Sequence, residues 1–153
     1  WRESAALVLR RGPYVVAAGL DERAPNAAPI VLGGPFIDLF SADLPIVSNV
    51  TLPPGRRALL RLLPGVPRDR PSVLAAACRV TNERVEAGAL RFDASGIGGT
   101  SAVVRVAAPA APTAVLVGGK PLPRTAWDYE GGTARLRFPN SVDPQPVEVR
   151  FSR

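Results

Sequence analysis

The segment 126–138 constrains the fold of this chain more than any other part of the sequence. Trp127 and Tyr129 are two residues apart, so both side chains point to the same face of an extended strand. The pair Gly131-Gly132 follows, and glycine readily adopts the positive φ angles of a two-residue hairpin turn. Residues 133–138 then alternate again between apolar and polar side chains. The pattern predicts a β-hairpin with one buried face.

Short apolar runs recur along the whole chain, separated by turn-forming residues. The 153 residues include 14 glycines and 17 prolines, which argues against long helices. Strands are expected at 6–10, 14–18, 29–32, 36–40, 46–52, 57–63, 72–81, 85–93, 100–107, 113–117, 126–130, 133–138 and 147–151. The prediction is an all-β fold, an antiparallel β-sandwich of immunoglobulin-like or related topology.

Two segments have helix as the rival interpretation. Residues 56–63 contain good helix formers, yet prolines on both sides confine the run to eight residues, which is short for a stable helix. Residues 73–85 are rich in alanine and contain no internal breaker, so helix stays open there as an alternative. Strand is the prediction for both segments.

The length of the chain fits one domain, and a single β-sandwich over residues 1–153 is predicted. The proline-rich stretch 64–71 is interpreted as a crossover between the two halves of that sandwich, with a linker between two small domains as the alternative. The chain starts at Trp1 and contains no methionine, which indicates a processed chain or a fragment of a longer protein.

The net charge of +6 raises the question of an acidic partner. All but one of the 19 basic residues are arginine, the exception being Lys120, and this bias fits the codon usage of a GC-rich bacterial genome. The arginines are dispersed, and no aromatic residue lies between Phe40 and Phe92 to stack on bases. Nucleic acid is therefore not expected as a partner. Membrane insertion is not expected either, because no apolar run reaches transmembrane length.

The absence of histidine excludes Ser/His/Asp and Cys/His arrangements and removes the commonest metal ligand. The single cysteine, Cys78, lies in an apolar run and cannot form an internal disulfide, so the compartment stays undetermined. No metal site and no cofactor are expected. Gly96-Ile97-Gly98-Gly99-Thr100 resembles a phosphate-binding loop, but strands on both sides predict an ordinary hairpin connection there.

Two kinds of candidate site remain. A glycosidase can work with two carboxylates alone, and the candidates are Asp21, Glu22, Asp38, Asp43, Asp128 and Glu130. Asp38 is the most interesting of them, because it is expected on the same strand face as Phe36 and Phe40, where a carboxylate is at an edge, hydrogen-bonded or functional.

Trp127 and Tyr129 could form a stacking platform for a sugar ring. The competing interpretation, core packing against Ala134, Leu136 and Phe138, is preferred. In that register Arg135 and Arg137 are expected on a solvent-facing surface near Glu148.

The C-terminal part of the chain resembles a known class of domain. The segments that carry the resemblance are Val115–Leu122, Trp127–Tyr129, Ala134–Asn140 and Val147–Phe151. Their strand and turn pattern is similar to the C-terminal β-sandwich domains that follow the catalytic domain in many bacterial glycoside hydrolases. The resemblance implies a non-catalytic module that packs against a catalytic domain or holds an oligomer together, and it carries over no catalytic residue.

The expected function is therefore an accessory or structural β-sandwich module of a larger carbohydrate-active protein, not catalytic by itself. Its expected partner is a catalytic domain of the same polypeptide or a second copy. Two alternatives stay open, namely a carbohydrate-binding or adhesion module, with Trp127, Tyr129 and Asp38 as weak ligand-binding candidates, and a small carboxylate-dependent hydrolase.

Overall fold

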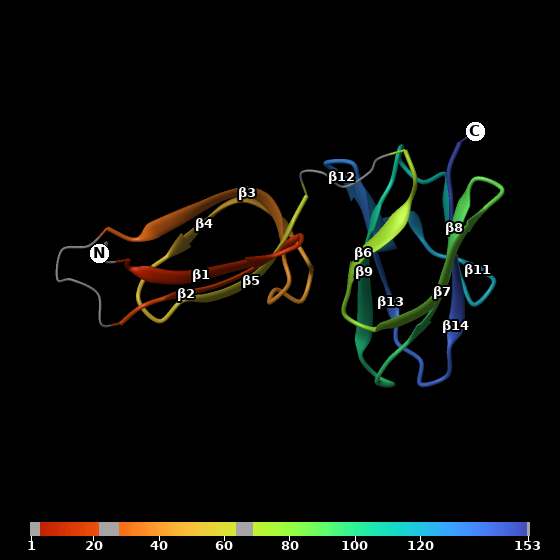
Figure 1. Ribbon diagram of the computed structural model, residues 1–153. Helices are drawn as coiled ribbons and strands as arrows, with labels where there is room; N and C mark the ends of the chain where they lie inside the picture. The colour runs from red at the N-terminus through yellow and green to blue at the C-terminus, as the bar shows by residue number, and fades with distance from the viewer. Residues whose placement is uncertain (1–3, 22–27, 64–68, 153) are drawn as a thin grey trace. The chain divides into compact units, whose positions relative to one another are not determined.

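A computed structural model shows an all-β chain built from antiparallel sheets (Figure 1). The structure describes residues 4–21, 28–63 and 69–152. Its internal contacts divide the chain into two compact units, Trp1–Gly65 and Val66–Arg153, called unit 1 and unit 2 below. The prediction of an all-β fold is confirmed, and residues 73–85 contain strands rather than a helix. The single strand expected at 72–81 is wrong, because residues 77 and 78 separate two strands, 72–76 and 79–86.

The division between the units falls inside the proline-rich stretch 64–71. Within this stretch, residues 64–68 lie outside the described part of the chain. Each unit has its own sheet hydrogen bonds and its own apolar cluster, as the linker alternative requires. A single cooperative domain over residues 1–153 stays a prediction, for which the Discussion gives a test.

Unit 1 is one five-stranded sheet with the order β1-β2-β5-β3-β4. Its strands are β1 (Ala6–Arg11), β2 (Tyr14–Gly19), β3 (Ile30–Asp38), β4 (Ile46–Leu52) and β5 (Arg57–Leu62). The sheet curves, since β2 and β4 approach each other although two strands separate them in the sheet order. The concave side holds a small core that includes Val15, Phe36, Leu52 and Leu60. A curved single sheet buries side chains on its concave face. Its core therefore does not cover the convex face of β1 and β2.

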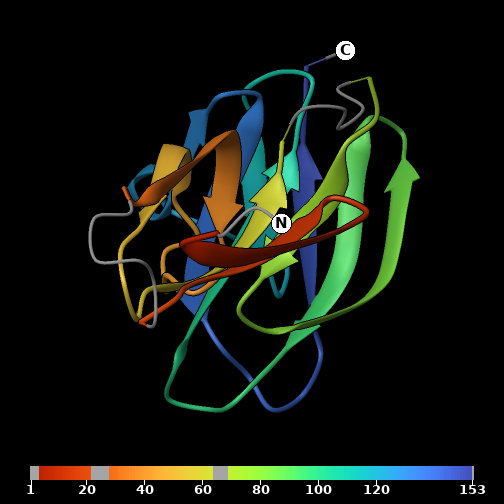
Figure 2. The ribbon, with the colours of Figure 1, turned by 60° about the vertical axis from the view of Figure 1, so that its left-hand side comes forward.

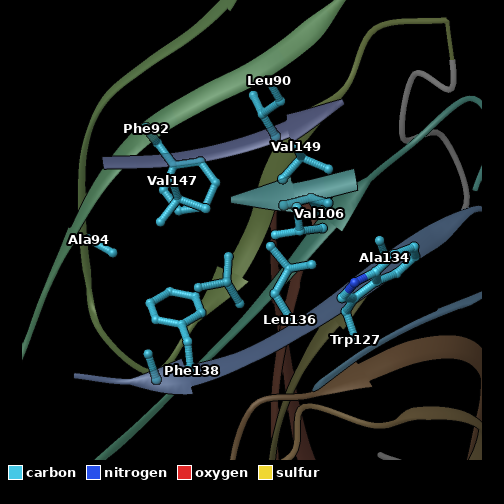
Figure 3. Packing of buried hydrophobic residues seen from close by; sticks show 13 residues of the cluster. Leu90, Phe92, Ala94, Val106, Trp127, Ala134, Leu136, Phe138, Val147 and Val149 are labelled. Atoms are coloured by element: carbon cyan, nitrogen blue, oxygen red, sulfur yellow. The ribbon is translucent and has the colours of Figure 1, made fainter. Parts of the chain in front are cut away.

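Unit 2 is a β-sandwich. Its elements are β6 (Ser72–Ala76), β7 (Arg79–Glu86), β8 (Ala89–Ser95), β9 (Ser101–Ala107), β10 (Ala114–Val117), β11 (Lys120–Pro121), a short 3-10 helix η1 (Arg124–Ala126), β12 (Trp127–Glu130), β13 (Thr133–Pro139) and β14 (Gln145–Arg150). One sheet has the order β11-β10-β14-β8-β7 and the other the order β12-β13-β9-β6. Phe92 and Val149 from the first sheet and Leu136 and Val106 from the second belong to one buried cluster between the sheets (Figure 3).

The hairpin that the sequence predicts at 127–138 is confirmed. Trp127 lies opposite Leu136 and Tyr129 opposite Ala134, and both turn glycines, Gly131 and Gly132, have positive φ. One turn of unit 2 was not predicted from the sequence. A continuous strand is expected at 85–93, but the chain reverses at Ala87 and Gly88, both with positive φ, and forms the β7–β8 hairpin. Alanine is rarely found in this conformation, so Gly88 alone signals the turn in the sequence.

Two further expectations are corrected. The predicted strands 29–32 and 36–40 form one strand, β3, whose register shifts between Gly33 and Phe36 and which ends at Asp38. The expectation that Arg135 and Arg137 lie near Glu148 is also wrong. Both arginines belong to β13 and Glu148 belongs to β14, and these strands are in different sheets.

Candidate functional site

Trp127 lies in the core of unit 2. Its side chain is 6% exposed and belongs to the same buried cluster as Leu136 and Ala134 (Figure 3). The guanidinium carbon of Arg124 stands 3.8 Å from the centroid of the indole ring, and Arg124 Nη1 donates a hydrogen bond of 2.6 Å to the Trp127 carbonyl. A sugar platform needs an open aromatic face. The surroundings of Trp127 instead match the core-packing interpretation.

Tyr129 follows on the same strand and is half-buried against the same cluster. Its hydroxyl donates a long hydrogen bond of 3.4 Å to the Ala108 carbonyl, which fixes the polar end of the ring at the edge of the sandwich. Trp127 and Tyr129 are thus neighbours on one strand face, as predicted, and that face is the inner one.

Asp38 belongs to unit 1, at the C-terminal end of β3. One carboxylate oxygen accepts a hydrogen bond of 3.0 Å from the Phe40 backbone N–H, and the other accepts one of 2.9 Å from the Ser41 hydroxyl. Aspartate commonly caps a turn in this way. Because β3 ends here, Phe40 leaves the strand and is 62% exposed, so the expected shared face of Asp38 with Phe36 and Phe40 is wrong for Phe40.

The two carboxylates with depressed pKa values are held by arginines. Asp128 Oδ2 accepts hydrogen bonds from Arg135 at 2.8 Å and Arg137 at 3.2 Å. Partial burial alone would raise the pKa of Asp128, but the hydrogen bonds and positive charges of these arginines together hold it below its usual range. Glu148 pairs instead with Arg150 and Arg91, and the hydrogen bond from Arg150 is the main reason why the pKa of Glu148 is lowered.

The remaining carboxylate candidates are Asp21, Glu22, Asp43 and Glu130. Glu22 lies outside the described residues, and the described part of the chain contains no group of three or more potential metal ligands. Burial raises the pKa of the half-buried Cys78 thiol, which keeps it in the weakly nucleophilic protonated form.

The sequence analysis missed an exposed apolar surface, the convex face of β1 and β2. Leu7 and Leu9 are each 65% exposed, and Val16, opposite Leu9 in the register, is 49% exposed. Tyr14 lies on the same face and is 41% exposed. We call these four residues the apolar face; they lie on the red hairpin of Figures 1 and 2. Large apolar side chains that gather on a surface typically mark an interaction site.

The sequence contains a signal for this face. Residues 6–9 and 15–18 are apolar at consecutive positions, so both faces of β1 and β2 are apolar. Such runs are typical of strands that are covered on both sides. Among the described residues of unit 1, the cluster that contains Val15 and Ala17 covers the concave side, and Leu7, Leu9 and Val16 on the other side are exposed.

Arginines surround the apolar face. Arg11 shares the face with Leu7 and Leu9 on β1, and Arg57 and Arg61 occupy the same side of the sheet on β5. Arg61 Nη1 donates a hydrogen bond of 3.0 Å to the Tyr14 hydroxyl, and its guanidinium carbon lies 5.5 Å from the ring centroid. Among the described residues no carboxylate forms an ion pair with these three arginines.

Comparison with known protein families, with curated proteins and with solved structures finds no match for this chain. In the part of the chain that the structure describes, no helix has the length and apolar character required for a membrane crossing.

Proposed function

We propose that the chain is a non-catalytic accessory module of a carbohydrate-active protein, and that its apolar face packs against a catalytic domain. The observation that carries the proposal is the exposure of Leu7, Leu9 and Val16 side by side on one strand pair. Complete burial of a leucine or valine side chain contributes about 1.5–3 kcal/mol. Three such residues supply a substantial part of the free energy of a domain contact.

The non-catalytic part of the proposal is supported by the chemistry of the chain. It has no histidine, and its one cysteine has a raised pKa. The Asp38 carboxylate is engaged in the turn that follows β3, and that of Asp128 in ion pairs with two arginines. These bonds give both carboxylates a role in holding local structure, in a turn and in a hairpin respectively.

The link to carbohydrate-active proteins is supported by the resemblance of residues 115–151 to domains that follow glycoside hydrolase catalytic domains. Such a domain is covalently attached to its partner, so contact needs no high intrinsic affinity. A face of a few apolar side chains is sufficient under these conditions.

The proposal is tested by Leu7→Asp in two settings, the isolated chain and the complete product of its gene. The new charge stays solvated in the isolated chain, so its melting temperature should change little, as for most exposed sites. In the complete product the same charge should be buried against the catalytic domain and lower the melting temperature by several degrees. Hydrogen exchange of residues 6–18 should likewise be slower in the complete product.

The matched control is Val142→Asp, which places a charge at an apolar residue of unit 2 with 74% exposure. It should have the same small effect in both settings. Glycoside hydrolysis by the isolated chain, or a gene product without a catalytic domain, would contradict the proposal.

A further inference from the structure

β1 is an end strand of its sheet, and its outer edge is the starting point of the inference. Among the strands of the described residues, the sheet order places β2 on one side of β1 and none on the other. In an antiparallel ladder every second residue directs its backbone N–H and C=O groups away from the neighbour, so the open edge carries donors and acceptors that another strand can use.

Natural edge strands are usually protected by charged residues, proline or a bulge. β1 runs in unbroken register along β2 from Ala6 to Arg11 and contains no proline. Leu7, Val8 and Leu9 are all exposed at its centre, and the only charges are Arg10 and Arg11 at its end. The strand therefore has the length, regularity and apolar character of a pairing site, with its charges confined to one end.

The charges at that end indicate which chemistry an added strand must have. Arg10 and Arg11 are exposed and have no carboxylate partner among the described residues. In unit 2, by contrast, Arg84 pairs with Glu86, and Arg91 with both Glu86 and Glu148. An occupant with acidic residues would satisfy the unmatched guanidinium groups of β1. A second copy would bring the same arginines and another net charge of +6 to the contact.

We propose that β1 binds an extended, acidic segment of the partner catalytic domain as an additional antiparallel strand. This inference rests on the proposed function and specifies how the partner engages unit 1. Directly paired residues of neighbouring strands share a face, so the outward row of the added strand meets Arg11, Leu9 and Leu7 in that order. The segment should thus read acidic residues first, then apolar residues at alternate positions.

The probe is the synthetic peptide Asp-Glu-Val-Thr-Leu-Thr, labelled for fluorescence anisotropy and titrated against the intact chain. Its first two residues would face Arg11 and Arg10, and its valine and leucine would face Leu9 and Leu7. The comparison peptide, Lys-Lys-Val-Thr-Leu-Thr, keeps the apolar residues and reverses the charge. Two further peptides carry backbone N-methyl groups at alternate residues, one at the odd and one at the even positions, and one of these patterns removes the donors for the β1 edge.

The acidic peptide should bind about tenfold or more tightly than the lysine peptide at low ionic strength, and 1 M salt should reduce this difference because it shortens the Debye length to about 3 Å. N-methylation on the side facing β1 should abolish binding, so both methylation patterns are tested. Arg11→Glu should reverse the preference between the two charged peptides. The control Arg79→Glu, at an exposed arginine of β7 in unit 2, should leave it unchanged.

Several results would overturn strand addition at β1. These are equal binding of the two charged peptides, an unchanged preference in Arg11→Glu, binding of both N-methylated peptides, or no saturable binding up to about 1 mM. A dimer of the chain that Leu9→Asp dissociates would assign the edge to a second copy instead. If the peptide fails while residues 6–18 are still protected in the complete gene product, the docking proposal survives and the strand-addition proposal does not.

Discussion

Trp127 illustrates how single residues of this chain are fixed by their neighbours. The ring fills the space between the sheets of unit 2, and the Arg124 guanidinium covers it at 3.8 Å. The indole therefore combines apolar burial with a cation–π contact. Both contributions belong to folding rather than to ligand binding, and they can be measured separately from binding.

We expect Trp127→Ala to lower the free energy of unfolding by about 3–5 kcal/mol, because the substitution leaves a cavity in the core. The urea midpoint of the two proteins measures this loss. Ile97→Ala, at an exposed residue in the β8–β9 connection, is the control and should leave the midpoint nearly unchanged. A polysaccharide pull-down that loses binding while the midpoint stays constant would instead support the sugar platform.

At the scale of elements, β12 depends on a polar contact as well as on its buried aromatic residues. It is an end strand of its sheet, and Asp128 lies directly opposite Arg135 on β13. Arg137, two residues further along β13, binds the same carboxylate. The ion pairs of Asp128 stabilise the outer face of the β12–β13 hairpin, and apolar burial stabilises its inner face.

The pH dependence of stability should report this contact. The folded-state pKa of Asp128 is lowered, so its contribution is present above the unfolded-state pKa of about 3.9 and is lost as the pH falls through the folded-state value. We expect Asp128→Asn to lower the urea midpoint at neutral pH and to reduce its decline in acid. The midpoints of both proteins from about pH 2 to pH 7 measure the effect.

The control for Asp128 is Asp143→Asn, at an exposed carboxylate that forms no ion pair with the described residues. Its pH profile should follow that of the original chain. Parallel profiles of the Asp128→Asn variant and the original chain would show that the Arg135 contact does not stabilise the hairpin.

At the scale of the whole molecule, the division into two units defines how stability is distributed. Leu60 is fully buried in the cluster of unit 1, and Leu136 is fully buried in the cluster of unit 2. Unit 1 ends at Gly65 and has only a single sheet, so its own core is small for a domain. A face that is exposed in such a unit is a natural place for additional burial against a partner.

We expect Leu60→Ala to accelerate hydrogen exchange in residues 6–62 and to leave residues 72–150 protected, and Leu136→Ala to have the opposite pattern. Each truncation should cost about 2–5 kcal/mol in its own unit. Hydrogen exchange of the full chain followed by mass spectrometry distinguishes the two patterns. Loss of protection throughout the chain in either variant would support the single cooperative domain predicted from the sequence.

Local features of this fold could be predicted from the sequence because their causes are local. Alternation of apolar and polar residues determines which strand face is buried, and Gly131-Gly132 determines where the hairpin turns. The turn at Ala87-Gly88 could not be predicted, because one of its two residues is not a turn former. Gly96 is a second feature whose cause is not local. A Cβ at this position would lie 2.6 Å from Asn140 Oδ1, and this contact exists only in the folded chain.

The sequence by itself determined the all-β fold, the inward position of Trp127 and the absence of histidine chemistry, since these depend on residue types and their spacing. Tertiary structure alone decided that β13 and β14 belong to different sheets and that Asp128, rather than Glu148, binds Arg135 and Arg137. It also decided that β1 is an edge strand, which leaves Leu7 and Leu9 exposed. Strand order and sheet membership depend on pairing between distant segments, and local periodicity is the same whichever strand becomes the neighbour.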